Sequence, residues 1–279
     1  MTEKAQLSFD CAEAAQSIRH FAVGFAVLTK NGREEDAFPA GSGTLAKLGP
    51  ISGIVTAAHV LKALPDKGEV GLVRFNSRGQ VQKQTIEMSH AEKVIISAGD
   101  GPLGPDLGFL QLPPVNGGNL EATNNFFNLG KRREAHAAPM YFEAVVGVVG
   151  EWTADVRPTS TTRRKDLELL FGGGQVTGKS HLPNGFDLCT FKVDYAADVK
   201  KPSTYKGVSG GGLWRVYYQF DAGERQVVRE KRLVGVAFYE FTEPDGSQMI
   251  TCHGPRSIYR HLVERMQERW PECRDGGRM

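Results

Sequence analysis

Short apolar runs separated by turn residues recur along most of this 279-residue chain. Such runs, bounded by glycine, asparagine and serine, are typical of β-strands rather than helices. In the first half they lie at residues 21–28, 41–46, 51–57, 70–75, 81–96 and 107–112. In the second half they lie at residues 140–152, 167–171, 186–193, 213–220, 226–241 and 248–253. This spacing predicts an all-β fold, with the strands forming a barrel or a sandwich.

Segments at the two ends of this series predict helices. Residues 10–19 start with Asp10 as an N-cap candidate and Glu13 three residues later, as in a capping box. Near the C-terminus, the apolar residues recur at helical spacing on one face. These residues are Ile258, Leu262, Val263 and Met266. A short N-terminal helix and a closing C-terminal helix are therefore expected.

A serine stands among glycines at residues 207–212, directly before an apolar run. Glycine lets the backbone turn tightly and approach a ligand without a Cβ in the way. Ser209 is a candidate nucleophile, because the amides of such a turn can point at a developing oxyanion. A serine in a glycine-rich stretch is also found in ordinary flexible turns, so Ser209 needs support from elsewhere in the chain.

Two upstream stretches supply the partners that a nucleophilic serine needs. A β-rich run ends in two small residues and His59, and Asp106 opens an alternating apolar run. An imidazole must take the proton of the serine hydroxyl, and a carboxylate must fix the tautomer of that imidazole. We interpret His59 as general base and then general acid, and Asp106 as the orienting carboxylate. Asp100 is a rival to Asp106, but no apolar strand follows it directly.

The three blocks resemble the catalytic signatures of the trypsin-like (chymotrypsin-fold) serine peptidases, of a bacterial intracellular type. They read Thr-Ala-Ala-His at 56–59, Asp-Leu-Gly-Phe-Leu-Gln-Leu at 106–112 and Gly-Val-Ser-Gly-Gly at 207–211. The resemblance covers roughly residues 20–265. It implies a serine endopeptidase that works through an acyl-enzyme, with catalytic residues His59, Asp106 and Ser209. The backbone N–H groups of Gly207 and Ser209 would form the oxyanion hole, each lowering the barrier by about 3 kcal/mol.

The resemblance also implies a domain organisation. Two six-stranded antiparallel β-barrels would enclose the site between them, with His59 and Asp106 from the first and Ser209 from the second. The expected units are an N-terminal helical extension (1–19), a first barrel (20–115), a connection (116–138), a second barrel (139–255) and a C-terminal helix (256–270).

Two departures from the secreted relatives concern the compartment and activation. In the secreted relatives a cysteine usually follows the catalytic histidine, whereas this chain has Val60 at that position. The four cysteines of the chain show no metal-ligand spacing. In zymogen-activated relatives an aspartate before the catalytic serine pairs with a newly cut N-terminus. This chain has Val208 at that position, so activation by N-terminal cleavage is not expected. Either the loop is competent as synthesised, or something other than a cleaved terminus orders it.

Composition excludes several other classes of function. The net charge of +2 is too small to imply nucleic-acid binding. No stretch approaches the ~20 apolar residues needed to span a bilayer, and residues 1–10 lack the pattern of a secretory signal. We expect reduced thiols at Cys11, Cys189, Cys252 and Cys273, a cytoplasmic location, and no metal, cofactor or membrane partner.

Substrate preference is read by analogy with the same family. Phe238, Tyr239 and Glu240 match the strand that pairs with the substrate backbone, and Ser203 matches the base of the specificity pocket. A serine at that base argues against an acidic floor. Glu240 replaces a residue that is usually glycine, so it narrows the pocket or adds a negative charge. The hypothesis is a basic or small side chain before the scissile bond.

Three interpretations of function follow. The first is a serine endopeptidase acting on protein or peptide substrates. The second is a catalytically silent trypsin-fold binding or scaffold protein. The third is a peptidase that stays latent until a partner protein or ligand orders the Val208 loop, as an effector of a bacterial antiviral defence system, which rests on analogy alone. The remaining histidines lack a catalytic context and are interpreted as structural: His20, His90, His136, His181, His253 and His261.

Overall fold

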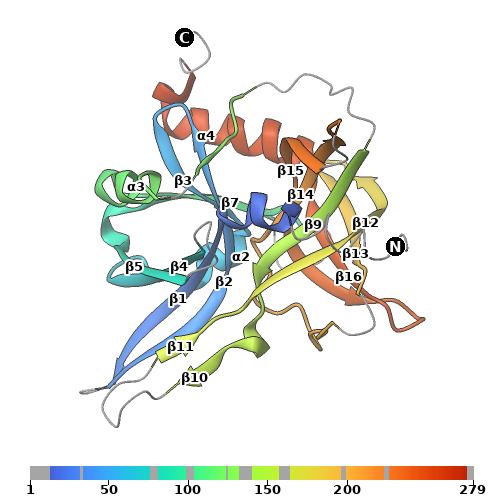
Figure 1. Ribbon diagram of the computed structural model, residues 1–279. Coiled ribbons are helices and arrows are strands. Elements are labelled where there is room, and N and C mark those ends of the chain that lie inside the picture. The colour runs from blue at the N-terminus through green and yellow to red at the C-terminus, as the bar shows by residue number, and fades with distance from the viewer. Residues whose placement is uncertain are drawn as a thin grey trace.

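The computed structural model describes residues 13–31, 34–75, 81–98, 104–123, 125–131, 140–156, 164–195, 199–222 and 226–274. Most of this described chain is β-strand, arranged in two large, essentially antiparallel sheets with few helices (Figure 1). The predicted all-β class is therefore confirmed. The first sheet comes from the N-terminal half of the chain and the second from the C-terminal half.

The first sheet follows the strand order β5-β4-β1-β2-β3-β7-β6, with β8 attached to β2. Its strands are β1 (Ala22–Asn31), β2 (Glu34–Leu48), β3 (Ile51–Thr56), β4 (Glu69–Phe75), β5 (Val81–Glu87), β6 (Glu92–Ser97), β7 (Asp106–Gln111) and β8 (Phe127–Asn128). The single run predicted at 81–96 is two strands, because a 3-10 turn at Met88–His90 buries Met88 and separates β5 from β6. With the two-residue β8, this brings the sheet to eight strands where six were expected.

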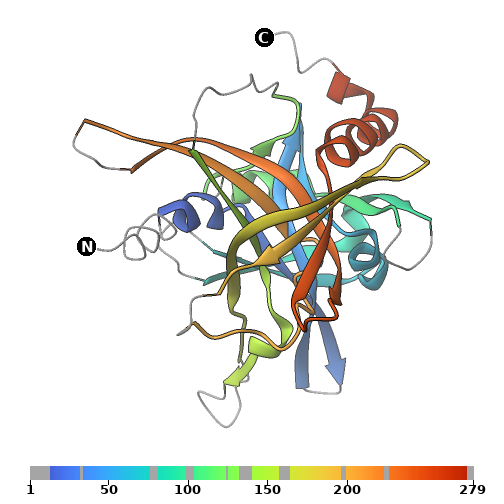
Figure 2. The same ribbon diagram turned by 90° about the vertical axis from the view of Figure 1, so that its right-hand side faces the viewer.

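The second sheet closes on itself as a six-stranded barrel in the order β12-β13-β16-β15-β14-β9. Its strands are β9 (Met140–Val148), β12 (Leu169–His181), β13 (Asp187–Val193), β14 (Gly212–Phe220), β15 (Gln226–Thr242) and β16 (Gln248–His253). A small hairpin of β10 (Ala154–Val156) and β11 (Arg164–Asp166) lies outside it. The orange β14–β15 hairpin extends well beyond the barrel wall (Figure 2).

Helices are short and lie at the edges of the sheets. Residues 13–19 are helical, whereas the N-cap candidate Asp10 lies outside the described residues. The others are α2 (Ala58–Ala63), α3 (Pro114–Glu121), a π-helical segment (Ser257–Leu262) and α4 (Val263–Arg269). In the described ranges, none is long and apolar enough to cross a membrane.

The C-terminal helical segment connects the two halves. Of its predicted apolar face, Ile258, Leu262 and Met266 are completely buried, and Val263 is partly buried. The segment packs on β6 and β7 of the first sheet, where Trp270 meets the ring of Phe109 at 5.8 Å. Apolar residues of both sheets also share one buried cluster, in which Trp214 of β14 lies against Phe21, just before β1. The two halves are thus held together by a common core.

Candidate active site

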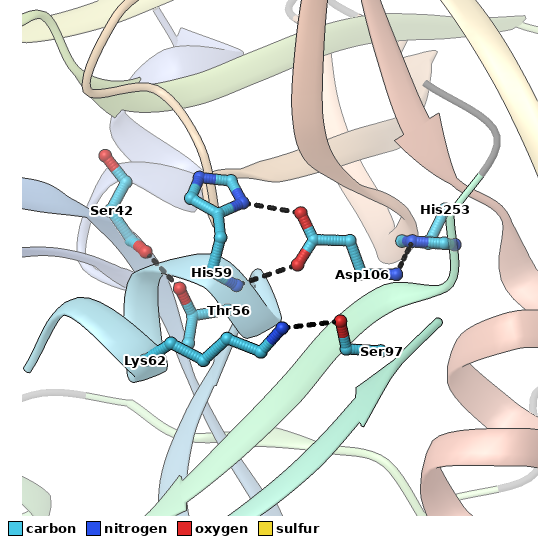
Figure 3. Close-up of polar contacts among 7 residues, drawn as sticks. All are labelled: Ser42, Thr56, His59, Lys62, Ser97, Asp106 and His253. Carbon is cyan, nitrogen blue, oxygen red and sulfur yellow. Dashed lines mark hydrogen bonds and ion pairs between the residues drawn. The ribbon is translucent and has the colours of Figure 1, made fainter. Parts of the chain in front are cut away.

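Strand pairing brings His59 and Asp106 to the same edge of the first sheet. β3 and β7 are antiparallel neighbours, so the end of β3 lies beside the start of β7. Asp106 is the first residue of β7, and α2 begins directly after β3 and carries His59 in its first turn. Lys62, one turn further along α2, donates a hydrogen bond to Ser97 Oγ at the end of β6 (2.7 Å; Figure 3). These contacts fix the helix that presents His59.

The carboxylate of Asp106 holds both the ring and the backbone of His59. His59 Nδ1 lies 2.5 Å from Asp106 Oδ2, and the His59 backbone N–H donates to Oδ1 at 2.8 Å (Figure 3). A carboxylate at Nδ1 selects the tautomer whose proton is on Nδ1, which leaves Nε2 free to act as a base. Burial raises the pKa of Asp106, but hydrogen bonding to His59 and its charge outweigh burial, and the pKa lies below its usual value. The rival Asp100 lies outside the described residues.

Two overlapping tight turns present Ser209. The N–H of Val208 donates to Tyr205 O (2.9 Å), and the N–H of Gly211 donates to Val208 O (2.7 Å). The third position of each turn has a positive φ, +99° at Gly207 and +86° at Gly210. That backbone region favours glycine, which explains why the motif has glycine at both positions. Ser209 lies between them.

The peptide groups of this loop are anchored so that two amides stay free. Gly150 N–H donates to Lys206 O at 2.8 Å, which turns the N–H of the same peptide, that of Gly207, the opposite way. The Ser42 hydroxyl donates to Gly207 O at 2.6 Å. Within the described ranges, the amides of Gly207 and Ser209 have no acceptor. They are the two amides that the family resemblance implies as donors to an oxyanion, which stays a prediction.

Ser42 of β2 links the first sheet to the loop at residues 205–211, which carries the candidate nucleophile Ser209 and is called the nucleophile loop below. Its backbone N–H donates to Ser209 O (2.7 Å), and its hydroxyl oxygen accepts from Val148 N–H (2.7 Å). Thr56, at the end of β3, donates its hydroxyl to Ser42 O (2.6 Å; Figure 3). Ser42 lies in the run predicted at 41–46, and its sequence context gives it no role.

A pocket of about 710 Å³ collects the candidate residues. Of the predicted site residues, those that line it are His59, Gly207, Ser209, Phe238, Tyr239 and Glu240. In the described part of the chain, no hydrogen bond joins Ser209 Oγ to His59. Ser203 is exposed and is not among the lining residues. Its amide and its hydroxyl both donate to the Glu151 carboxylate, which is one of them.

His253 lies behind Asp106, although the sequence suggests only a structural histidine there. Its Nε2 accepts a hydrogen bond from the Asp106 backbone N–H at 2.9 Å, and its ring stacks on Phe238 at 4.3 Å. The side chain is completely buried. Burial lowers its pKa to about 4, against the negative charges of Asp106 and Asp187. The ring is thus neutral at pH 7, and no motif in the sequence marks this contact.

Metal ligands and thiols do not add to this site. Across the described residues, no three His, Cys, Asp or Glu side chains gather as metal ligands would. Cys189 and Cys252 face each other on β13 and β16 as buried free thiols, and Cys273 is also free and buried. Burial raises the pKa of the Cys252 thiol. The described lining of the pocket contains no cysteine, and Ser209 contributes a hydroxyl to it.

No protein-family model matches the sequence, and no curated protein matches it. Among solved structures, the Rv3671c protease of M. tuberculosis in its active form is similar over 94% of this chain and 86% of its own, with 13% identity and a TM-score of 0.45. A mutant of tobacco etch virus protease is similar over 88% of this chain and 79% of its own, with 11% identity and a TM-score of 0.37. The tobacco vein mottling virus protease is similar over 88% and 83%, with 9% identity and a TM-score of 0.40. Likenesses at this level assign neither a function nor a site.

Proposed function

We propose that this chain is a serine endopeptidase that cleaves protein substrates through an acyl-enzyme. One observation carries the proposal: a carboxylate-paired imidazole, a serine between two positive-φ glycines and two amides without acceptors belong to one site. Each group has a separate part in acyl transfer. Folding alone would not require these groups to lie in one site. This combination supports catalysis over a turn serine and a structural histidine.

The proposed chemistry runs in two halves. Ser209 Oγ attacks the carbonyl carbon while His59 Nε2 takes its proton, and Asp106 stabilises the imidazolium that forms. The N–H groups of Gly207 and Ser209 hold the negative charge on the carbonyl oxygen. The C–N bond then breaks, His59 returns the proton to the leaving amine, and the acyl group stays on Ser209. Water activated by His59 releases it.

The proposal requires Ser209 Oγ to reach His59 Nε2 when a substrate is bound. Catalytic hydrogen bonds are often long or poorly aligned in unliganded enzymes and tighten in the complex with substrate. Both residues already face the same pocket, and His59 is held from its far side by Asp106. The proposal therefore expects a hydrogen bond from Ser209 Oγ to His59 Nε2 in the complex with substrate.

The surroundings of Val208 support a loop that is competent as synthesised. Val208 is 1% exposed and packs in a buried cluster with Tyr205, Leu213 and Ala237. Apolar burial thus takes the place of the ion pair that orders this loop in zymogen-activated relatives. We propose that the isolated chain is active. The latent form, its activating partner and a role in antiviral defence stay predictions from analogy.

Labelling with a fluorophosphonate probe tests this function. Wild type should gain a covalent adduct that mass spectrometry locates on Ser209, and Ser209→Ala should gain none. His59→Ala should slow labelling strongly, whereas Ser180→Ala, at an exposed serine on β12, is a matched control that should react like wild type. Casein cleavage in the same preparations measures turnover.

The silent-scaffold alternative makes the opposite prediction for the same experiment. A folded wild type, checked by circular dichroism, that forms no adduct on Ser209 would contradict the peptidase. Adduct formation without casein cleavage would retain the nucleophile and indicate narrow specificity. A partner that raises turnover manyfold would favour the latent form.

A further inference from the structure

The carboxylate of Glu240 bridges the two walls of the candidate pocket. Glu240 lies near the end of β15, on the strand predicted to pair with substrate. One oxygen accepts from the Tyr205 backbone N–H, and the other accepts from Thr204 Oγ1 at 2.9 Å. Thr204 and Tyr205 belong to the loop that leads to Ser209, and all three residues line the pocket. The carboxylate is therefore fixed in place in the pocket that Ser209 also lines.

This carboxylate keeps room for another donor. An ionised carboxylate offers about four acceptor positions, and the hydrogen bonds from Tyr205 and Thr204 use two of them. A cationic donor would gain most from the others, because hydrogen bonds between two charged groups are the strongest kind. A large apolar side chain would remove water from the charge without replacing it, and an acidic side chain would be repelled.

The rest of the lining suits a long cationic side chain. Glu151 adds a second carboxylate, and hydrogen bonds from the Ser203 hydroxyl and amide lower its pKa, so it is ionised at neutral pH. The described lining also contains one lysine, Lys206, so its two carboxylates outnumber its single ammonium group. Phe238 and Ile250 provide apolar wall, which can cover the methylene stem of lysine or arginine.

We propose that Glu240 selects a lysine or arginine side chain at the residue before the scissile bond. This assignment rests on the proposed peptidase function and names its substrate class. Glu240, rather than Ser203, then sets the preference for the residue before the scissile bond. Ser203 is exposed and is bound to Glu151.

A series of fluorogenic peptides that differ only at the residue before the scissile bond tests this assignment. Wild type should cleave the lysine and arginine peptides at least about tenfold better in kcat/KM than the alanine peptide, as expected for one hydrogen bond to a charged group. The leucine and glutamate peptides should be poorer still. Mapping the cleavage sites in casein by mass spectrometry should give the same order.

Glu240→Gln isolates the charge. The glutamine carbonyl can accept from the Tyr205 N–H, and its amide can donate to Thr204 Oγ1, so the bridge between the walls survives. The lysine-to-alanine ratio should fall at least about tenfold. Glu243→Gln makes the same change in net charge just after β15, outside the pocket lining, and should leave the ratio unchanged.

The results separate this inference from the function it rests on. A preference for the alanine peptide would mean that the Glu240 side chain blocks the pocket to long side chains. That result would overturn the inference. An unchanged ratio in Glu240→Gln would do the same. In both cases a fluorophosphonate adduct on Ser209 would still support the proposed peptidase function. Absence of the adduct in folded wild type would contradict both the peptidase function and the inference about Glu240.

Discussion

His253 Nε2 accepts a hydrogen bond from the backbone N–H of Asp106 at 2.9 Å (Figure 3). The last residue of β16 thereby holds the first residue of β7, across the boundary between the two sheets. Asp106 in turn holds the ring and the backbone of His59. His253 thus lies two contacts away from the proposed general base, where it would act as a positioning residue.

Removing this acceptor should reduce both stability and turnover. In His253→Leu the buried Asp106 N–H loses its partner, which should cost about 1–3 kcal/mol of unfolding free energy. The same change loosens Asp106, so kcat/KM should fall about tenfold or more. His253→Gln can accept the hydrogen bond and should recover much of the turnover. His261→Leu is the control, since His261 contacts Gly185 O and Phe186 instead; equal losses in both leucine variants would refute the positioning role.

Acid should destabilise the protein through His253 before Asp106 titrates. Burial lowers the pKa of His253 from about 6.5 to about 4. Between these pH values the unfolded chain binds a proton that the folded chain does not, so stability falls as the pH falls. Urea unfolding at pH 7.5 and pH 4.5 should show a wild-type loss about 2–3 kcal/mol larger than that of His253→Gln. Parallel losses in the two proteins would contradict this origin.

Gly207 should not tolerate a side chain. Its φ is +99°, and a Cβ would lie 2.8 Å from Val148 O and 2.9 Å from Gly150 N, where it would displace the proposed oxyanion donor. Gly207→Ala should lower kcat about 100-fold or more, the usual effect of losing one such donor. Gly246→Ala has a similar φ of +81° with nothing within 4 Å of the added Cβ, so its kcat should match wild type. Steady-state kinetics on one peptide compares them.

Val208→Asp should disorder the nucleophile loop. Val208 is buried among apolar side chains, and an unpaired carboxylate there should cost about 3 kcal/mol or more. Fluorophosphonate labelling of Ser209 should then be lost while the sheets keep their circular dichroism. Val208→Ala leaves the site apolar and should retain labelling. Full labelling of the aspartate variant would show that burial of Val208 does not order the loop.

Much of the fold could be predicted because strand periodicity is local. The predicted runs correspond to the large strands, but the run at 167–171 continues in the structure as β12 to His181. The glycines at 172–174 indicate a turn by composition. They lie in the strand because neighbours approach closely: a Cβ on Gly174 would be 2.0 Å from Lys192 O, and one on Gly173 would be 2.6 Å from the Phe142 ring. Such crowding comes from partners that are distant in sequence.

The candidate site divides in the same way. His59, Asp106 and Ser209 carry their signals in their own neighbours, and strand order explains how two of them meet. His253 and Ser42 act through single hydrogen bonds to segments more than a hundred residues away, 147 from His253 to Asp106 and 165 from Ser42 to Gly207. Nothing next to either residue in the chain marks these partners.

The contacts of Ser42 with the Ser209 loop have a consequence for timing during synthesis. Translation delivers His59 and Asp106 well before the residues at 207–211, and the Ser42 N–H has no Ser209 carbonyl to meet until that later stretch has left the ribosome. A half-made chain would carry a base without a nucleophile. If the chain is the proposed peptidase, this order would prevent it from cleaving its own unfolded segments, or neighbouring nascent chains, until both sheets have docked.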